Sequence, residues 1–351
     1  MGTFDDILKH GESLIKDENA LEFEFVPKII PHREQEQRMI VHAIEPLFKE
    51  RTGRNVFIYG SPGIGKTVAT KHVLRELEEK TDDIKTIYIN CWQKNTSHKI
   101  AVDICEAIGY RFVQNKNTTE LFKVIARILN EMSAVFVFDE IDKVEDVDFL
   151  YNLLEQVYRK SIILITNYQT WLSDLDERVR SRLTPEQVEF KQYTANETKA
   201  IIYSRISYAF PVGVWDETAL NTLSQKVGEL KDIRTGLFLL KESAYAAEDK
   251  AKRKIELEDV NKALAKLKDF TIKSSETLED ETKSIYAIVK EHSGKKIGDL
   301  FEIYQQQGGE SSYKTFQRKI DKLSDGKYVK TTKTTGKGGN TTIVEKKLTE
   351  F

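Results

Sequence analysis

The stretch Gly60-Ser61-Pro62-Gly63-Ile64-Gly65-Lys66-Thr67 has the pattern G-x-x-x-x-G-K-T. It follows the apolar run Val56-Phe57-Ile58-Tyr59 and precedes a segment expected to be helical to about Glu79. In this setting the glycines let backbone N–H groups surround phosphate oxygens, and the start of the helix adds partial positive charge. Lys66 is then expected to reach the terminal phosphates, and the Thr67 hydroxyl to bind Mg²⁺. The pattern predicts a P-loop, and with it a nucleoside triphosphate as ligand.

A second apolar run, Ala134-Val135-Phe136-Val137-Phe138, ends in Asp139 and Glu140. In a chain with a P-loop, such a run is typical of a Walker B strand. Asp139 is expected to hold Mg²⁺ through water, and Glu140 to orient or deprotonate the attacking water. The alternative is an ordinary strand end in solvent, which the P-loop disfavours.

The next expected strand, Ser161 to Asn167, ends in an amide. Doubly wound sheets bind ligands at the carboxyl ends of their strands, so Asn167 is expected to hydrogen-bond the attacking water or the γ-phosphate. An Asx turn is the alternative for this residue. Shortly after it, Arg178, Arg180 and Arg182 fall within five positions. Planar forked cations near a phosphate site suit clamps on transition-state charge, and a solvated face is the alternative.

The segment Phe25 to Glu34 is a loop held extended by prolines, with a helix expected after it. In P-loop proteins a loop just upstream often lines the pocket for the base and sugar. An N-terminal strap packed on the domain is equally favoured by the pattern. Both interpretations stay open at this point.

Length and composition predict a protein of two or three domains that works in the cytoplasm. The chain has 351 residues, of which 40% are hydrophobic and 31% are charged. Its apolar runs are too short and too interrupted by charge to span a bilayer, and no signal-peptide core is recognisable at the start. Cys91 and Cys105 are the only cysteines, and buried packing is expected for both rather than a disulfide or a zinc site.

The net charge of −2 is unevenly distributed. Residues 282–351 hold 14 Lys and Arg against 8 Asp and Glu, a net charge of +6, so the remainder is about −8. A basic region on an acidic body predicts a polyanionic partner for that region.

From Thr194 onward the pattern becomes helical. Thr194 and Glu197 form a predicted capping box at the start of this region. We expect a small helical lid, with Arg234 facing the nucleotide; a surface arginine is the alternative. Residues 271–281 are polar and predict a linker.

Three helices and a β-hairpin are expected beyond the linker, which is the order of a winged helix. The third helix should run from Ser312 to Leu323, and the strands from Tyr328 to Lys333 and from Thr341 to Lys346, around a Gly-rich basic tip. The residues expected to contact duplex DNA are Lys314, Thr315, Gln317, Arg318, Lys322 and, at the tip, Lys337. Many winged helices bind proteins instead, but the positive charge favours nucleic acid here.

The whole arrangement resembles the archaeal Orc1/Cdc6 replication initiators. The similarity includes the P-loop, the Asp139-Glu140-Ile141-Asp142 stretch, Asn167, the arginine-rich segment, the lid and the winged helix. It also includes the Val26-Pro27 pair, the His32-Arg33-Glu34 block and a helical pair after Ile89-Asn90-Cys91. It therefore extends over nearly the whole chain.

The resemblance implies roles for particular residues. Asn167 would be sensor 1, Arg234 sensor 2, and Arg178 or Arg182 the arginine finger, with Glu140 in a catalytic role. The helical pair after Cys91 matches an insertion that touches DNA in this family. Lys231 departs from the pattern, because the family usually has glycine there. The residues assigned to ATP or ADP binding are Val26, Pro27, His32, Arg33, Gly60, Ser61, Pro62, Gly63, Ile64, Gly65, Lys66, Thr67, Val68 and Asp139, with Thr67 and Asp139 holding Mg²⁺.

The resemblance implies an α/β protein with an AAA+ P-loop parallel-sheet domain, a helical lid and a C-terminal winged helix. The expected divisions are 1–24 (N-terminal segment), 25–190 (nucleotide-binding domain), 191–270 (lid), 271–281 (linker) and 282–351 (winged helix). Such a protein would be a slow ATPase that recognises double-stranded replication-origin DNA and helps recruit the replicative helicase. It would be located at the nucleoid and associate with itself or a paralogue on DNA. The alternatives are a branch-migration motor with a winged helix, and a nucleotide-switched DNA-binding regulator.

Overall fold

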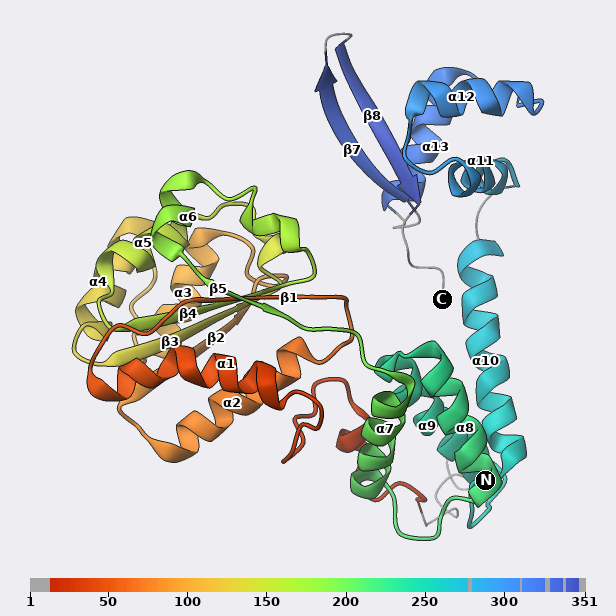
Figure 1. Cartoon of the computed structure of the whole chain (residues 1–351), viewed down its shortest axis with the longest axis horizontal. Helices are drawn as coiled ribbons and strands as arrows, with labels where there is room; N and C mark the ends of the chain where they lie inside the picture. The colour runs from red at the N-terminus through yellow and green to blue at the C-terminus, as the bar shows by residue number, and fades with distance from the viewer. Residues whose placement is uncertain (1–12, 277–279, 310, 326–328, 337–338, 347–351) are drawn as a thin grey trace. The chain divides into compact units, whose positions relative to one another are not determined.

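The short apolar runs of the sequence form a parallel β-sheet in the computed structural model (Figure 1). The structure describes residues 13–276, 280–309, 311–325, 329–336 and 339–346. The chain divides into two compact units, Met1–Val260 and Asn261–Phe351. Among the described residues, no helix combines the length and apolar character needed to cross a membrane.

Five strands build the sheet of the first unit, in the order β2-β3-β4-β1-β5. All the neighbouring strands are parallel. β3 and β4 are buried along their whole length, which explains why both are apolar without alternation. The register pairs Asn90 with Asp139, and Tyr59 with Thr166, so polar residues gather at one edge of the sheet. The strands are β1 (Val56–Tyr59), β2 (Ile84–Asn90), β3 (Ser133–Asp139), β4 (Lys160–Thr166) and β5 (Glu186–Glu189).

Helices cover both faces of this sheet (Figure 1). α1 (Glu34–Ile44) and α2 (Lys66–Lys80) pack on the face that carries Val135 and Val137. The other face carries Phe136 and is covered by α3 (Ser97–Ala107), α4 (Thr118–Leu129), α5 (Asp148–Gln156) and α6 (Glu177–Leu183). Cys91 and Cys105 are buried free thiols, as expected. Short 3-10 helices are η2 (Glu18–Leu21), η3 (Glu45–Lys49), η4 (Ile141–Lys143) and η5 (Gln169–Leu172).

The helical region after β5 begins with the predicted capping box. The Thr194 hydroxyl accepts a hydrogen bond from the Glu197 N–H, while the Glu197 side chain accepts from the Thr194 N–H. The residues before η2 attach to this region, since the Lys16 N–H donates to the Ala209 carbonyl at 2.7 Å. The helices are α7 (Ala195–Ala209), α8 (Glu217–Leu230), α9 (Ile233–Glu248) and α10 (Leu257–Glu276).

The expected linker at 271–281 is partly helical. α10 continues to Glu276, because the segment that follows Leu257 contains neither glycine nor proline to end a helix. Residues 277–279 lie outside the described part of the chain, and the next helix begins at Asp280. The division between the two compact units falls inside α10, so the domain boundaries stay a prediction.

The second unit has the expected order of three helices and a hairpin. A three-stranded antiparallel sheet, in the order β6-β8-β7, closes a core that includes Ile285, Leu300 and Phe316. The hairpin strands are longer than predicted and pair up to Gly336 and Gly339, because the β-branched threonines before the tip favour strand. The elements are α11 (Asp280–Glu291), β6 (Lys295–Lys296), α12 (Ile297–Gln306), α13 (Tyr313–Asp325), β7 (Val329–Gly336) and β8 (Gly339–Lys346).

Candidate functional site

The P-loop lies between β1 and α2 and is in close contact with the segment that follows β5. A Cβ atom on Gly60 would lie 2.3 Å from the carbonyl oxygen of Phe190, and one on Gly65 would lie 2.9 Å from the Tyr193 hydroxyl. Both glycines also have positive φ angles, of 149° and 87°. Side chains are therefore excluded at both positions by space and by backbone conformation.

Lys66 opens α2, and its ammonium group is held inside the loop. Its Nζ donates hydrogen bonds to the carbonyl oxygens of Gly60 and Ser61 and to Oδ1 of Asn167, each at 2.8 Å. Burial lowers the pKa of Lys66 to about 8, although the nearby Asp139 carboxylate opposes this shift. A group in this state is stabilised in its charged form by an anion, which is what a bound phosphate would supply.

Asp139 ends β3 and is 3% exposed. Its Oδ2 accepts hydrogen bonds from the Thr67 hydroxyl at 2.6 Å and from the Tyr88 hydroxyl at 2.7 Å. The predicted metal-binding pair, Thr67 and Asp139, is thus in direct contact. A hydroxyl and a carboxylate are hard oxygen donors, so this pair fits Mg²⁺, which usually retains several waters in such sites.

Tyr88 is a site residue that no pattern in the sequence predicted. It lies on β2, next to β3 in the sheet, and its hydroxyl orients the Asp139 carboxylate. Burial and the nearby Asp139 charge raise the pKa of Tyr88 well above its usual value, so the phenol stays a hydrogen-bond donor. No motif marks this residue, and only the strand order brings it to the site.

Glu140 follows Asp139 in a left-handed conformation, with φ 55°. Such a conformation is unfavourable for a residue with a side chain, by about 1 kcal/mol or more. The backbone N–H of Glu140 donates to Oδ1 of Asp139 at 2.9 Å, which holds the turn. Strained residues of this kind are concentrated at functional sites.

These residues surround a cavity of about 640 Å³. It is bounded by the P-loop, the ends of the strands, the N-terminal loop and α9 of the lid, all within the first unit. The predicted site residues that line it are Pro27, Pro62, Gly63, Gly65, Lys66, Thr67, Val68, Asp139, Glu140, Asn167 and Arg234. Lining residues that the sequence analysis did not single out include Phe23, Ile29, Lys71, Tyr88, Tyr193 and Leu237.

Arg234 reaches this cavity from the start of α9. Its backbone N–H donates to Oδ1 of Asp232, the N-cap residue, at 2.9 Å. Lys66 and Arg234 both line the cavity, and the charge of Arg234 contributes to the lowered pKa of Lys66. Lys231 ends α8 with φ 53°, a left-handed C-cap position where glycine is favoured. Lysine adopts the same conformation there, so the departure from the family pattern leaves Arg234 on the cavity.

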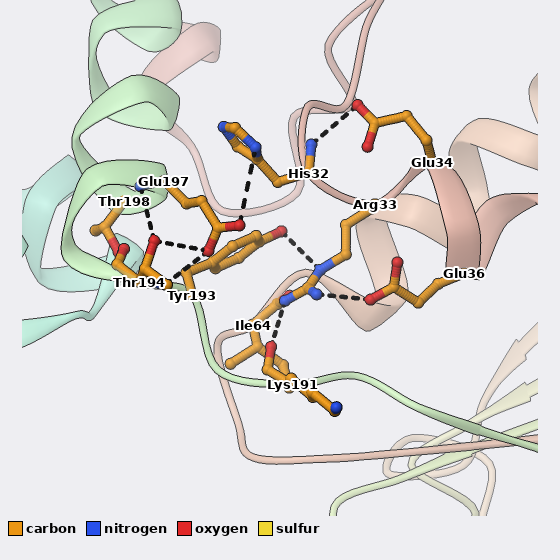
Figure 2. A network of polar contacts seen from close by, with 10 residues as sticks. All are labelled: His32, Arg33, Glu34, Glu36, Ile64, Lys191, Tyr193, Thr194, Glu197 and Thr198. Carbon is orange, nitrogen blue, oxygen red and sulfur yellow. Dashed lines mark hydrogen bonds and ion pairs between the residues drawn. The ribbon is translucent and has the colours of Figure 1, made fainter.

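Several predicted ligands do not line the cavity. Val26 is one of them. Its carbonyl oxygen and that of Pro27, which does line the cavity, accept hydrogen bonds from Arg75 of α2, at 3.0 and 2.9 Å, so this loop is attached to the P-loop helix. Arg33 is buried in a network of polar contacts with P-loop and lid residues (Figure 2). The remaining P-loop residues away from the cavity are Gly60, Ser61 and Ile64, and His32 lies beside Arg33.

The arginines of α6 also lie outside the cavity. Arg178 pairs with Asp176 at 3.1 Å, and Arg182 pairs with Glu155 at 3.1 Å. Arg180 donates to the Ser173 carbonyl at 3.0 Å. Within one chain, none of these three side chains contributes to the lining of the cavity. Action on a neighbouring subunit stays a prediction.

The exposed face of α13 carries part of the predicted DNA-binding set. Phe316, Ile320 and Leu323 are buried in the core of the second unit. Lys314, Gln317 and Arg318 are exposed, whereas Thr315 is half-buried and its N–H donates to the Ser312 carbonyl at 2.9 Å. The side chain of Lys322 and the whole of Lys337 lie outside the described part of the structure.

The parallel sheet, the P-loop and the acidic end of β3 define a P-loop protein of the AAA class. The family model described as AAA domain matches residues 49–175. The chain is 31% identical to ORC1-type DNA replication protein 1 of Sulfolobus acidocaldarius over 335 residues, which cover 90% of this chain and 84% of that protein. It therefore belongs to the family of ORC1-type DNA replication proteins.

Two further comparisons agree with this assignment. The chain is 31% identical to ORC1-type DNA replication protein 1 of Sulfurisphaera tokodaii over 317 residues, which cover 85% of this chain and 78% of that protein. Its fold is similar to that of the Aeropyrum pernix Orc1 protein, solved in complex with DNA, with a TM-score of 0.69 and 25% identity. That similarity covers 95% of this chain and 94% of the solved one. The expected AAA fold with a C-terminal winged helix is thus confirmed.

Proposed function

We propose that this protein is an ATP-dependent initiator of DNA replication that binds origin duplex DNA. The observation that supports it most is the meeting of Lys66, Asp139, Asn167 and Arg234 at one cavity in a chain of the ORC1-type family. P-loop, Walker B and two sensor positions are the groups that nucleotide binding and hydrolysis require.

Lys66 binds the terminal phosphates of ATP, and the backbone N–H groups of the P-loop surround the others. Thr67 and Asp139 would hold Mg²⁺, which would neutralise charge on the phosphates. Glu140 orients or deprotonates the attacking water, and Asn167, already bonded to Lys66, contacts that water or the γ-phosphate. ADP would remain in the same cavity after hydrolysis.

Hydrolysis by the isolated chain should be slow. The arginines of α6 are outside the cavity of their own chain, and a missing arginine finger typically lowers the rate of P-loop enzymes by a factor of about 10³–10⁵. We therefore propose that Arg178 or Arg182 acts on the nucleotide of a second copy or of a paralogue bound to DNA. ATP bound between subunits would then control assembly and recruitment of the replicative helicase.

The DNA-binding part of the proposal is supported by the solved DNA complex of the A. pernix relative and by the exposed basic face of α13. This face has Lys314 and Arg318 one helical turn apart, beside Gln317, a composition suited to phosphate and base-edge contacts. A protein with this role should be found at the nucleoid.

Chromatin footprinting of the wild-type protein and of the Lys66→Ala variant tests the proposal. An initiator should occupy one or a few repeat-containing origins, and loss of ATP binding should change its occupancy there. Occupancy spread over promoters would instead favour the nucleotide-switched regulator. Vigorous DNA-stimulated turnover by a stable hexamer would favour a motor.

A further inference from the structure

The guanidinium group of Arg33 joins three segments that are distant in the sequence (Figure 2). Arg33 is 4% exposed. Its Nη2 donates to the carbonyl oxygens of Ile64, at 3.1 Å, and Lys191, at 2.6 Å. Its Nε donates to the Tyr193 hydroxyl at 3.0 Å, and its Nη1 to Oε1 of Glu36 at 2.7 Å. The three nitrogens are thus engaged by protein groups of α1, the P-loop and the segment between β5 and α7.

Tyr193 contacts Arg33 in two ways and also lies next to the P-loop. The guanidinium carbon of Arg33 lies 3.9 Å from the centre of the Tyr193 ring, a cation–π contact in addition to the hydrogen bond. The Tyr193 hydroxyl is also 2.9 Å from the position that a Cβ would take on Gly65, and Tyr193 lines the cavity. The same tyrosine therefore contacts Arg33 and the backbone of the P-loop.

The bond to Ile64 has a consequence for phosphate binding. The Ile64 carbonyl and the Gly65 N–H belong to one planar trans peptide, so they point in opposite directions. Neither Arg33 nor Ile64 lines the cavity, whereas Gly65, the next residue, does. Fixing the carbonyl thus fixes the direction of an N–H group that a phosphate would meet.

α7, the first helix of the lid, begins at Ala195, two residues after Tyr193. Thr194 is the N-cap of α7, and Glu197 completes its capping box. Nδ1 of His32, the residue before Arg33, lies 4.0 Å from Oε1 of Glu197 (Figure 2). A displacement of the P-loop peptide would therefore be transmitted to the first turn of α7.

We propose that Arg33 and Tyr193 are positioning residues that couple the P-loop to the lid, so that nucleotide in the cavity changes the state of α7 through the Ile64 carbonyl, Arg33 and Tyr193. The inference rests on the ATP binding proposed above. This coupling role differs from direct binding of the base or sugar by Arg33. A coupling residue should change the affinity for every nucleoside triphosphate by the same factor.

Binding measurements separate these two roles. Arg33→Lys keeps the charge but loses the planar fork that serves several acceptors at once, and Tyr193→Phe removes only the hydroxyl. Calorimetry with Mg²⁺ measures the affinities. Arg33→Lys should weaken the binding of ATP, 2′-deoxy-ATP and ITP by one common factor of about ten or more. Tyr193→Phe should weaken the binding of all three nucleotides by a smaller factor. The control variant is Arg38→Lys, at an exposed position on α1, and it should bind them as the wild type does. Weakening confined to one analogue would overturn the proposal.

Hydrogen exchange at saturating ATP tests the coupling itself. In the wild type, ATP should slow exchange both in the P-loop helix and in the first turn of α7. In Arg33→Lys and Tyr193→Phe, protection of α7 should be lost while that of the P-loop helix remains. Retained protection of α7 would overturn the coupling, even if affinity were lower.

Two controls make the result decisive. If Lys66→Ala bound ATP normally, the proposed nucleotide site would be wrong. If Lys66→Ala abolished binding while Tyr193→Phe and Arg33→Lys behaved as the wild type, only the coupling would be wrong. Circular dichroism establishes folding, and Tyr193→Phe decides the question if Arg33→Lys does not fold.

Discussion

The ammonium group of Lys66 donates a hydrogen bond to the Asn167 carboxamide at 2.8 Å, across 101 positions of sequence. It joins the P-loop to the residue that follows β4, the direct neighbour of β1 in the sheet. The contact places the proposed phosphate-binding cation and the proposed sensor group at one point. Nucleotide at this point would compete with Asn167 for Lys66, which gives the sensor a physical means of responding to the γ-phosphate.

Lys66 and Glu140 should have separable effects. Lys66→Ala should abolish ATP binding, because it removes the cation that faces the phosphates. Glu140→Gln should retain binding and block hydrolysis, because the P-loop and the metal-binding pair are unchanged. Calorimetry and phosphate release measure the two properties, and equal loss of binding in both variants would contradict the assignment.

ATP affinity should decrease as the pH rises above 8. Burial lowers the pKa of Lys66 to about 8, so above that pH most of the free protein has a neutral Lys66. Because ATP binds the protonated form, the dissociation constant should increase by up to about tenfold for each further pH unit. Titrations between pH 7 and 9.5 measure the slope of the logarithm of the dissociation constant against pH.

Lys71→Met is the control for this pH series, since Lys71 also lines the cavity. It should lower affinity at every pH but keep the slope of the wild type. A wild-type affinity that stays constant to pH 9.5 would show that Lys66 is not the group that titrates.

The arginines of α6 should act between subunits. A variant with both Arg178→Ala and Arg182→Ala retains its own ATP site, whereas Lys66→Ala retains its arginines. Mixing the two should restore part of the ATPase activity at mixed interfaces, measured under conditions where the wild type associates. Arg180→Ala is the comparison variant, because Arg180 lies on the same helix between the two proposed finger residues and is not one of them. Absence of recovery in the mixture would count against a role in trans.

Glycine at position 231 should stabilise the protein. Lys231 has φ 53°, and glycine adopts this conformation without the steric cost of a Cβ. Lys231→Gly should raise the free energy of unfolding by about 0.5–1 kcal/mol, measured in urea. Lys226→Gly, inside α8, should lower it by about 1 kcal/mol. A loss of stability in both variants would mean that Lys231 makes a favourable contact that outweighs its backbone strain.

The winged helix should read DNA through α13. Arg318→Ala should lower affinity for the origin site by about 1–3 kcal/mol relative to a scrambled duplex if the side chain contacts a base edge. Lys337→Ala should weaken binding to both duplexes equally and reduce the slope of log affinity against log salt by about one. Fluorescence anisotropy over a salt series, with ATP held constant, measures both effects.

Lys295→Ala, an exposed change elsewhere in the second unit, is the matched control and should leave the slope unchanged. If removal of residues 282–351 left affinity and slope intact, a protein partner would replace DNA as the ligand of this region.

The local parts of the site could be predicted from the sequence because short-range chemistry specifies them. The spacing of Gly60, Gly65 and Lys66 is sufficient for a phosphate-binding turn, and the apolar run before Asp139 is sufficient for a buried parallel strand. The amphipathic spacing of Phe316, Ile320 and Leu323 likewise predicted which side of α13 is buried. Each signal lies within one element and its immediate neighbours.

The sequence alone therefore specifies the helices and strands and the motifs at their ends. The tertiary structure alone decided that Tyr88 supports Asp139, that Arg33 is a buried connector rather than a cavity residue, and that Tyr193 packs on Gly65. These contacts join residues from different strands and loops, and they depend on strand order and on how the lid segment returns to the P-loop. No local pattern encodes that order, because it results from burying all the apolar faces at once.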